Sequence, residues 1–165
     1  LLPGNRFRFV LLGSGDEALE EILLQLRAEF PSRVGIEIGY DQSLSHKIEA
    51  GADFFLMPSR FEPCGLNQLY SLRYGTIPIV RHTGGLADSV QNLNPVHHAN
   101  GTATGISFIP LTPQAIVRAV DRALELHQSP TTYAAVQRNG MHQKFSWDRA
   151  SEDYLETYDA ATIEP

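Results

Sequence analysis

The stretch that decides the fold runs from Phe54 to Val90 and reads FFLMPSRFEPCGLNQLYSLRYGTIPIVRHTGGLADSV. Two apolar runs without alternation, Phe54–Met57 and Ile77–Val80, predict buried strands, and helical spacing of apolar residues predicts a helix between them. Polar residues and glycines gather where the two strands end. Because parallel sheets bind ligands at the carboxyl ends of their strands, this stretch also predicts where a functional site lies.

The same alternation of strands and helices extends along the chain. Strands are predicted at Arg8–Leu12, Val34–Ile38, Asp53–Met57, Ile77–Arg81 and Gly105–Phe108. Helices are predicted at Glu17–Glu29, Ser43–Ala50, Leu66–Tyr74, Leu86–Gln91, Pro113–Gln128, Thr131–Gln143 and Trp147–Ala160. Residues 92–104 are rich in Asn, Gly, His and Pro and predict a surface loop. We therefore expect an α/β fold, a Rossmann-like parallel sheet flanked by helices on both faces.

The first turn of the deciding stretch combines a carboxylate with the start of a helix. Gly65 allows a close approach of the backbone to a ligand. The backbone N–H groups of Gly65, Leu66 and Asn67 would open the helix and predict an anion site suited to a diphosphate. Glu62 beside such a site has little use in pure phosphate binding. It indicates a reaction in which positive charge develops near a phosphate leaving group, as in glycosyl transfer.

The second turn, which follows the strand at Ile77, repeats this arrangement with Thr83, Gly84 and Gly85. Two glycines leave no side chain between the backbone and a ligand, although a Gly-Gly pair is a weak signal by itself. Its position at a neighbouring strand end strengthens the prediction. Three cations are expected near this site and suit a small anionic ligand: Arg60, Arg73 and Arg81.

Composition narrows the class of protein. The 165 residues suit one domain, and 42% hydrophobic residues are ample for a core. A net charge of −6 without a basic stripe argues against a nucleic-acid partner. The single cysteine excludes an internal disulfide, and no signal-like or membrane-spanning segment is seen, so we expect a cytoplasmic protein without a membrane partner. His97 and His98 lack further ligand spacing, and no metal site is predicted.

The segments PSRFEPCGLNQLY and YGTIPIVRHTGGLAD closely resemble the signature region of bacterial glycogen synthases and plant starch synthases. The segments LLGSGD, IGYDQSLSHKIEAGADF and FSWDRASEDY are similar to the same family. These enzymes are retaining glucosyltransferases of the two-domain GT-B fold. The resemblance implies that residues 1–165 form a single nucleotide-sugar-binding domain from the carboxyl-terminal domain of a GT-B fold. It also implies that the amino-terminal acceptor domain and the first part of the carboxyl-terminal domain lie outside this sequence.

The resemblance carries roles over to individual residues. It implies that Glu62 is the catalytic carboxylate that stabilises charge on the transferred sugar, and that Tyr40 packs on adenine. The remaining nucleotide- or sugar-binding positions implied by the match are Cys64, Gly65, Leu66, Asn67, Thr83, Gly84 and Gly85. Related retaining families often carry a second Glu eight residues after the first. Tyr70 stands there in this chain, as is usual for the synthases.

The activity implied by the resemblance is that of a hexosyltransferase without a cofactor. It would bind ADP-glucose as donor and transfer glucose, with retention, to the non-reducing end of an α-1,4-glucan in glycogen or starch synthesis. The missing amino-terminal domain is the expected partner, and the chain alone is expected to be inactive, because transfer needs both substrates held together. Two alternatives stay open: a non-catalytic nucleotide- or glucan-binding module of the same fold, and another retaining GT-B transferase that uses UDP-glucose.

Other conspicuous residues have structural interpretations. The turn Gly13–Asp16 lacks the third glycine of a dinucleotide fingerprint and predicts a strand-to-helix turn capped by Asp16. For Cys64, a small packed thiol is favoured over a nucleophile. His46 is as consistent with a helix-face role as with a ligand role. Phe145 and Trp147 indicate core or interdomain packing, and a tail that packs on the missing domain would leave apolar residues exposed.

Overall fold

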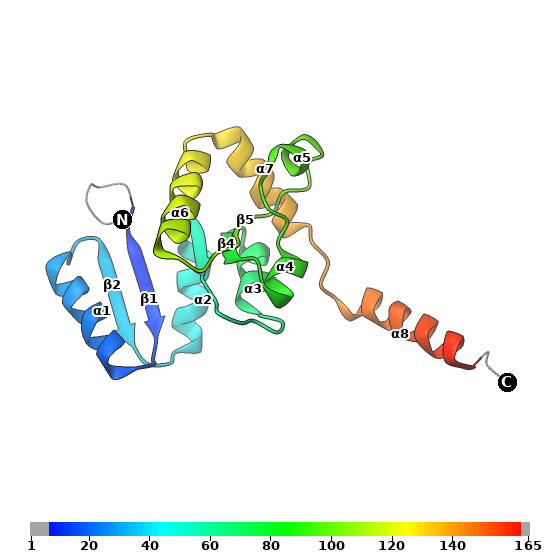
Figure 1. Ribbon diagram of the computed structural model, residues 1–165, viewed down its shortest axis with the longest axis horizontal. Helices are drawn as coiled ribbons and strands as arrows, with labels where there is room; N and C mark the ends of the chain where they lie inside the picture. The colour runs from blue at the N-terminus through cyan, green and yellow to red at the C-terminus, as the bar shows by residue number, and fades with distance from the viewer. Residues whose placement is uncertain (1–6, 163–165) are drawn as a thin grey trace.

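The structure, a computed structural model, describes residues 7–162 apart from the side chain of Arg149. The strands of this part of the chain are β1 (Phe9–Gly13), β2 (Val34–Ile38), β3 (Phe54–Met57), β4 (Ile77–Arg81) and β5 (Ile106–Phe108). The helices are α1 (Glu17–Glu29), α2 (Gln42–Gly51), α3 (Asn67–Tyr74), α4 (Gly84–Ser89), α5 (Pro95–Ala99), α6 (Pro113–His127), α7 (Pro130–Met141) and α8 (Trp147–Thr162). Figure 1 shows them in space.

All paired strands are parallel, and helices connect them, so the predicted α/β fold class is confirmed. The strands form two hydrogen-bonded groups rather than one continuous sheet: β1 pairs with β2, and β3, β4 and β5 form a second group in that order. In Figure 1 the pair β1–β2 lies at the left, and α2 lies between it and the rest of the molecule. Helix α2 contacts both β1 and α3 and so joins the two groups.

The predicted strands and helices begin and end within two residues of the observed ones. The exception is the stretch 92–104, where the predicted surface loop contains the short helix α5. The Asn94 side chain accepts a hydrogen bond from the N–H of His97 over 2.8 Å, and Pro95 occupies the first helical turn. Asn before Pro is a signal for a turn, but it can equally start a helix. The sequence analysis considered only the turn, and the helix was therefore not predicted.

The helices that follow β1 and β2, α1 and α2, are each capped by an aspartate at the amino terminus. Asp16 accepts hydrogen bonds from the N–H groups of Ala18 and Leu19, and Asp41 accepts one from Leu44. Each carboxylate satisfies an N–H group that has no partner within its own helix. The prediction that Asp16 caps a strand-to-helix turn is therefore confirmed.

The core lies on both faces of β4. On one face Ile77 and Ile79 pack with the buried alanines of α6 and with Val136 of α7. On the other face Val80 is fully buried with Leu86 of α4. Burying one such aliphatic side chain stabilises the fold by about 1.5–3 kcal/mol. This two-sided core holds the carboxyl ends of β3 and β4, and with them the predicted site, in place.

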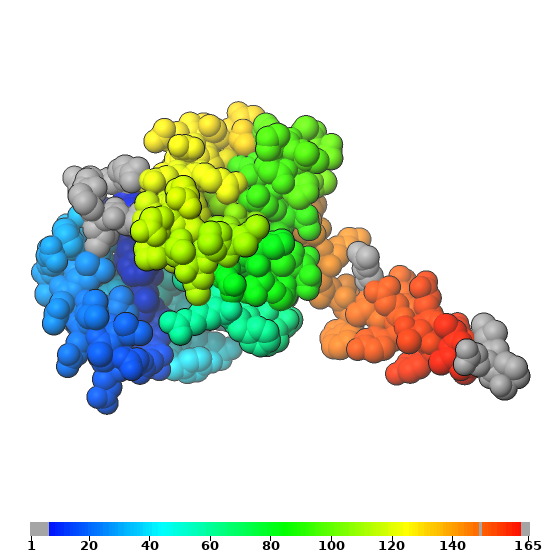
Figure 2. Space-filling view, viewed as in Figure 1, coloured from blue at the N-terminus to red at the C-terminus, as the bar shows by residue number. Residues whose placement is uncertain are grey.

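Helix α8 projects away from the rest of the molecule (Figures 1 and 2). Trp147 is 79% exposed and Phe145 is 47% exposed, so neither packs in the core of this chain. Tyr154, Leu155 and Tyr158 are also exposed, which confirms the expected exposure of the tail. Between residues 7 and 162, the structure contains no helix that is both long enough and apolar enough to cross a membrane.

Candidate active site

The turn after β3 leads into α3, which begins at Asn67. Gly65 has a φ of +75°, in the left-handed region that residues with a side chain rarely adopt. A Cβ atom on Gly65 would also overlap the side-chain amide of Gln68. Both the conformation of the turn and the space around it therefore require glycine at position 65.

The amino terminus of α3 has unpaired backbone N–H groups, as the sequence predicts. Leu66, the N-cap residue, makes no side-chain capping bond. Within the described residues, the N–H groups of Gly65, Leu66 and Asn67 have no hydrogen-bond acceptor. Such groups carry the positive end of the helix dipole and bind anions. The turn can therefore accept a phosphate group without breaking any of its own hydrogen bonds.

Glu62 lies on the same turn, three residues before Gly65, and is half-buried. Ser59 donates a long hydrogen bond, 3.4 Å, from its Oγ to Glu62 Oε2. Among the described residues, Glu62 Oε1 has no protein partner. The carboxylate thus keeps an oxygen available to stabilise positive charge on a substrate next to the phosphate-accepting N–H groups.

The first turn, residues 58–66 after β3, and the second turn, residues 82–85 after β4, lie directly against each other and together form the joined turns. The N–H of Gly85 donates to the carbonyl oxygens of Glu62 and Pro63, over 3.1 and 3.3 Å. A Cβ atom on Gly84 would overlap the Glu62 carbonyl, and one on Gly85 would overlap the Cys64 carbonyl. The sequence suggested that Gly84 and Gly85 leave room for a ligand. In the structure, these two positions must lack a side chain because the backbone of the first turn lies against them.

Thr83 is the N-cap residue of α4 and makes no side-chain capping bond. Its carbonyl accepts the N–H groups of Leu86 and Ala87. Its hydroxyl makes no hydrogen bond within the described residues. Thr83 is therefore placed beside the joined turns with a hydroxyl that a ligand can use.

Two of the three predicted cations donate hydrogen bonds to backbone carbonyls of the protein. Arg81 Nη1 donates to the carbonyls of Arg60 (2.6 Å) and Ser59 (3.3 Å), and so fixes the start of the first turn. Arg73 lies in the last turn of α3, away from the amino terminus of that helix, and donates to Met141. The prediction that Arg73 belongs to a cationic cluster at the site is wrong. Arg60 is exposed, and its side chain makes no hydrogen bond within the described residues.

No hydrogen bond or ring contact within the described residues joins Tyr40 to the two turns. Tyr40 follows β2, in the other strand group, and its side chain is 88% exposed without a ring contact in the described part of the chain. Cys64 lies on the first turn and is exposed, so the predicted packed thiol is wrong. Its Sγ lies 3.5 Å from the carbonyl of Gly65.

The buried face of α3 combines polar and apolar residues. Leu66 is 56% exposed, whereas Gln68, Ser71 and Leu72 are buried. The burial of Gln68 was not predicted, because the helix was predicted from the spacing of its apolar residues alone. Its spacing of four residues from the buried Leu72 is the signal that places both on one helix face.

Two groups with shifted pKa values lie outside the joined turns. Burial raises the pKa of Glu49 on α2, and nearby His46 opposes that rise. Burial, together with the charge and hydrogen bond of Asp53, raises the pKa of Tyr133 on α7 to about 12. His46 packs against Tyr70 and contacts the hydroxyl of Tyr74, in agreement with a helix-face role.

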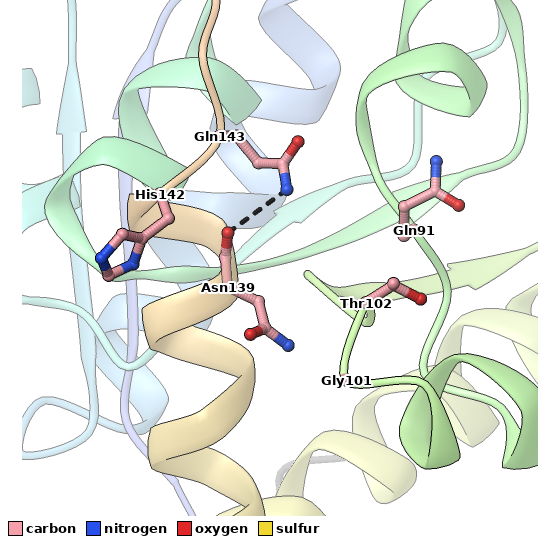
Figure 3. Close-up of a pocket in the computed structure, with 6 residues that line it drawn as sticks. All are labelled: Gln91, Gly101, Thr102, Asn139, His142 and Gln143. Atoms are coloured by element: carbon pink, nitrogen blue, oxygen red, sulfur yellow. Dashed lines mark hydrogen bonds between the residues drawn. The ribbon is translucent and has the colours of Figure 1, made fainter.

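Two surface hollows lie outside the joined turns or at their border. Figure 3 shows one of about 470 Å³, with Gln91 and Thr102 on one side and Asn139, His142 and Gln143 on the other. A second, of about 300 Å³, is lined by His82 and His97 and borders the turn at Thr83. Neither includes Glu62. Among the described residues no group of three or more His, Cys, Asp or Glu is arranged to hold a metal ion.

Comparison with known proteins identifies close relatives of this sequence. Over 158 residues the chain is 51% identical to a glycogen synthase of Thioalkalivibrio sulfidiphilus, which covers 96% of this chain and 33% of the relative. It is 52% identical over 151 residues to glycogen synthase 1 of Methylococcus capsulatus, covering 92% and 31%. The chain therefore spans about a third of the length of the curated relatives that it matches.

Solved structures agree with these relatives. The catalytic domain of starch synthase IV from Arabidopsis thaliana, bound to ADP and acarbose, superposes with a TM-score of 0.80 at 26% identity. The superposition covers 99% of this chain and 40% of that one. A sucrose-phosphate synthase from Thermosynechococcus elongatus shares the fold with a TM-score of 0.64. The expected resemblance to glycogen and starch synthases, and the Rossmann-like architecture of a GT-B carboxyl-terminal domain, are confirmed. Residues 2–141 match the sequence profile of glycosyl transferases group 1, and the chain belongs to that family.

Proposed function

We propose that this chain is the donor-binding part of a retaining hexosyltransferase that transfers glucose from ADP-glucose to the non-reducing end of an α-1,4-glucan. The observation that carries the proposal is the pair of joined turns. They present unpaired N–H groups at Gly65, Leu66 and Asn67 beside the Glu62 carboxylate. The glycogen synthase relatives, and the ADP in the starch synthase IV structure, support the same donor.

The proposed mechanism uses these groups directly. The bond between the anomeric carbon and the diphosphate breaks as the 4-hydroxyl of the glucan attacks from the same face. The new glycosidic bond forms at that carbon, and the hydroxyl proton passes to the departing phosphate oxygen. The N–H groups at the start of α3 stabilise the charge on the leaving diphosphate, and Glu62 stabilises the oxocarbenium-like sugar. ADP leaves, and no cofactor takes part.

We further propose that the chain works only within a larger polypeptide. The observed strand groups, β2–β1 and β3–β4–β5, reproduce the doubly wound order 3-2-1-4-5-6 without its first strand. That strand would pair between β1 and β3 and make one sheet of the two groups. Val10 of β1, 53% exposed, and Leu19 and Ile22 of α1, 60% and 58% exposed, would be covered by the same added unit.

The missing amino-terminal domain would hold the glucan acceptor against the joined turns, so that the chain alone binds donor without transferring it. The predicted cytoplasmic location is kept as part of this proposal. Helix α8, which projects away from the rest of the described chain, is available for contact with such a domain.

Transfer by the full-length enzyme tests the proposed function. We expect radiolabelled glucose to pass from ADP-glucose to glycogen, and Glu62→Gln to lower kcat by about 10²–10³-fold with ADP affinity nearly unchanged. Glu37→Gln, on the exposed side of β2, is the matched control and should transfer normally. Loss of ADP binding with unchanged kcat in Glu62→Gln would refute the catalytic assignment. Absence of transfer by the unmodified enzyme would favour a binding module.

Donor choice is tested by calorimetric titration of this chain with ADP and with UDP. Preferential binding of ADP that weakens in Tyr40→Ala would support the adenine contact proposed for Tyr40. Preferential binding of UDP would favour the alternative transferase. Equal affinities, or an unchanged affinity in Tyr40→Ala, would remove Tyr40 from the proposed site.

A further inference from the structure

Gln68 is a buried polar residue at the junction of the two turns. Its side chain has no solvent exposure, and its Nε2 lies 2.9 Å from the carbonyl oxygen of Cys64 and 3.0 Å from that of Gly65. Two carbonyl oxygens can only be met by the nitrogen of the amide, so the orientation of the side chain follows from its partners. Gln68 thus holds the carbonyls of the first turn from inside α3.

The same nitrogen reaches the second turn through Ser89. Gln68 Nε2 lies 3.2 Å from Ser89 Oγ, and Ser89 Oγ donates to the carbonyl of Gly85. The N–H of Gly85 in turn donates to the carbonyl of Glu62. A closed chain of hydrogen bonds therefore links α3, the first turn and the second turn, and it passes through the residue that carries the proposed catalytic carboxylate.

This arrangement has a cost that an apolar side chain of similar size would avoid. Gln68 Oε1 is buried and has no hydrogen-bond donor within the described residues. A buried, unpaired polar atom lowers stability by about 1–3 kcal/mol, and a methionine or leucine would fill the same space without it. Retaining an amide at this cost fits a requirement for its donors at the two turns.

We propose that Gln68 is a positioning residue that, with Ser89, sets the geometry of both turns and thereby places Glu62 and the N–H groups of Gly65 and Leu66 for transfer. The proposal rests on the proposed function for its catalytic consequence. Its structural consequence, that the two turns separate when the amide is lost, is independent of any activity. Gln68 acts through the turns and need not touch the substrate.

Two variants test this proposal against a matched control. Gln68→Met keeps the length of the side chain and removes its donors, and Ser89→Ala removes only the link to Gly85. Gln137→Met is the control, because Gln137 makes the same kind of bond, 2.7 Å to the carbonyl of Gly75, at the opposite end of α3. Each is compared with the unmodified protein, and all rates are expressed per folded molecule, well below the melting temperature of each variant.

Hydrogen exchange of the Gly85 N–H in this chain is the structural readout. We expect about 10-fold faster exchange or more in Gln68→Met, a smaller increase in Ser89→Ala, and no added increase in the double variant, because one hydrogen-bonded chain is broken once. Exchange in β4 should stay unchanged, and Gln137→Met should leave Gly85 protected. Unchanged exchange at Gly85 in Gln68→Met would overturn the proposed link.

Steady-state kinetics of the full-length enzyme give the catalytic readout. Gln68→Met should lower kcat by about 10–100-fold, because a displacement of about 1 Å in a catalytic group has an effect of this size. ADP affinity should fall as well, since the same turn carries the N–H groups, whereas Glu62→Gln affects kcat alone. Faster exchange at Gly85 with unchanged kcat would reject the positioning role. A full-length enzyme that transfers no glucose would reject the proposed function and leave the exchange result to stand by itself.

Discussion

The strand group β1–β2 with α1 and the strand group β3–β4–β5 are built from the same local pattern but are packed very differently. In the first, Val34 and Ile36 are buried, whereas α1 buries no residue in the described chain. In the second, Val80, Ile106 and Leu86 have no solvent exposure. A parallel sheet is stable when both of its faces are covered, and only the second group achieves this within the chain.

The space around the glycines differs between the two groups in the same way. No atom lies within 4 Å of a Cβ built on Gly13, Gly15 or Gly39. In the second group, a Cβ on Gly84 or Gly85 would overlap the neighbouring backbone. The part of the molecule that carries the proposed catalytic turns is therefore tightly packed within this chain. The part that carries Tyr40 is loosely packed within this chain, as the proposed added strand and domain would require.

The largest expected difference between the two strand groups is the loss of stability when a leucine is replaced by alanine. Leu72 of α3 is 2% exposed and Leu19 of α1 is 60% exposed. Leu72→Ala should lower the free energy of unfolding by about 2–5 kcal/mol, because a cavity remains, and Leu19→Ala should change it by about 0.5 kcal/mol or less. Urea denaturation of both variants measures this. Equal losses would show that α1 is packed as well as α3 and would contradict the comparison.

The next largest difference in stability between the two groups is expected for glycine-to-alanine substitutions. Gly85→Ala places a methyl group against the backbone of Cys64, which cannot yield as a side chain would. We expect a loss of about 1–3 kcal/mol in stability. Gly13→Ala meets open space and should stay within about 0.5 kcal/mol of the unmodified chain. Thermal unfolding monitored by circular dichroism distinguishes them, and a neutral Gly85→Ala would mean that the turns lie further apart.

Amide exchange should show whether the proposed added strand changes the first group. In this chain, amides of β1 should exchange faster than those of β4, because β1 has one paired edge and little cover. In the full-length enzyme, β1 should gain protection while β4 changes little. If β1 is equally protected in both, the proposed pairing between β1 and β3 is wrong.

The smallest effect is expected at Glu49 on α2, which joins the two groups. Burial raises the pKa of Glu49 in the folded state above its ordinary value of 4.5. The folded state therefore binds the proton more tightly, and stability falls as pH rises from 4.5 through the folded pKa. Glu49→Gln should be more stable than the unmodified chain at neutral pH, with the difference shrinking as pH falls and vanishing below pH 4.5. Unfolding curves across this range check it, with exposed Glu29→Gln as control.

Local pattern was sufficient to predict most of the secondary structure, because apolar runs, capping aspartates and glycine turns act over a few residues. Asp16 and the strand Ile77–Arg81 were predicted correctly for this reason. Helix α5 was missed because Asn94–Pro95 serves equally in turns and at helix starts. The exposure of Cys64 and the burial of Gln68 were also missed, since burial depends on what another segment places against a residue.

The sequence by itself determined the fold class, the family, the position of the candidate site at the ends of β3 and β4, and Glu62 as its candidate charge-stabilising carboxylate. Only the tertiary structure decided that Gly84 and Gly85 make room for the neighbouring turn, and that Gln68 links both turns through Ser89. It also decided that the strands fall into two groups. The physical reason is that hydrophobic periodicity and turn chemistry are local. Contacts between backbones about twenty residues apart depend on how two strand ends meet in space.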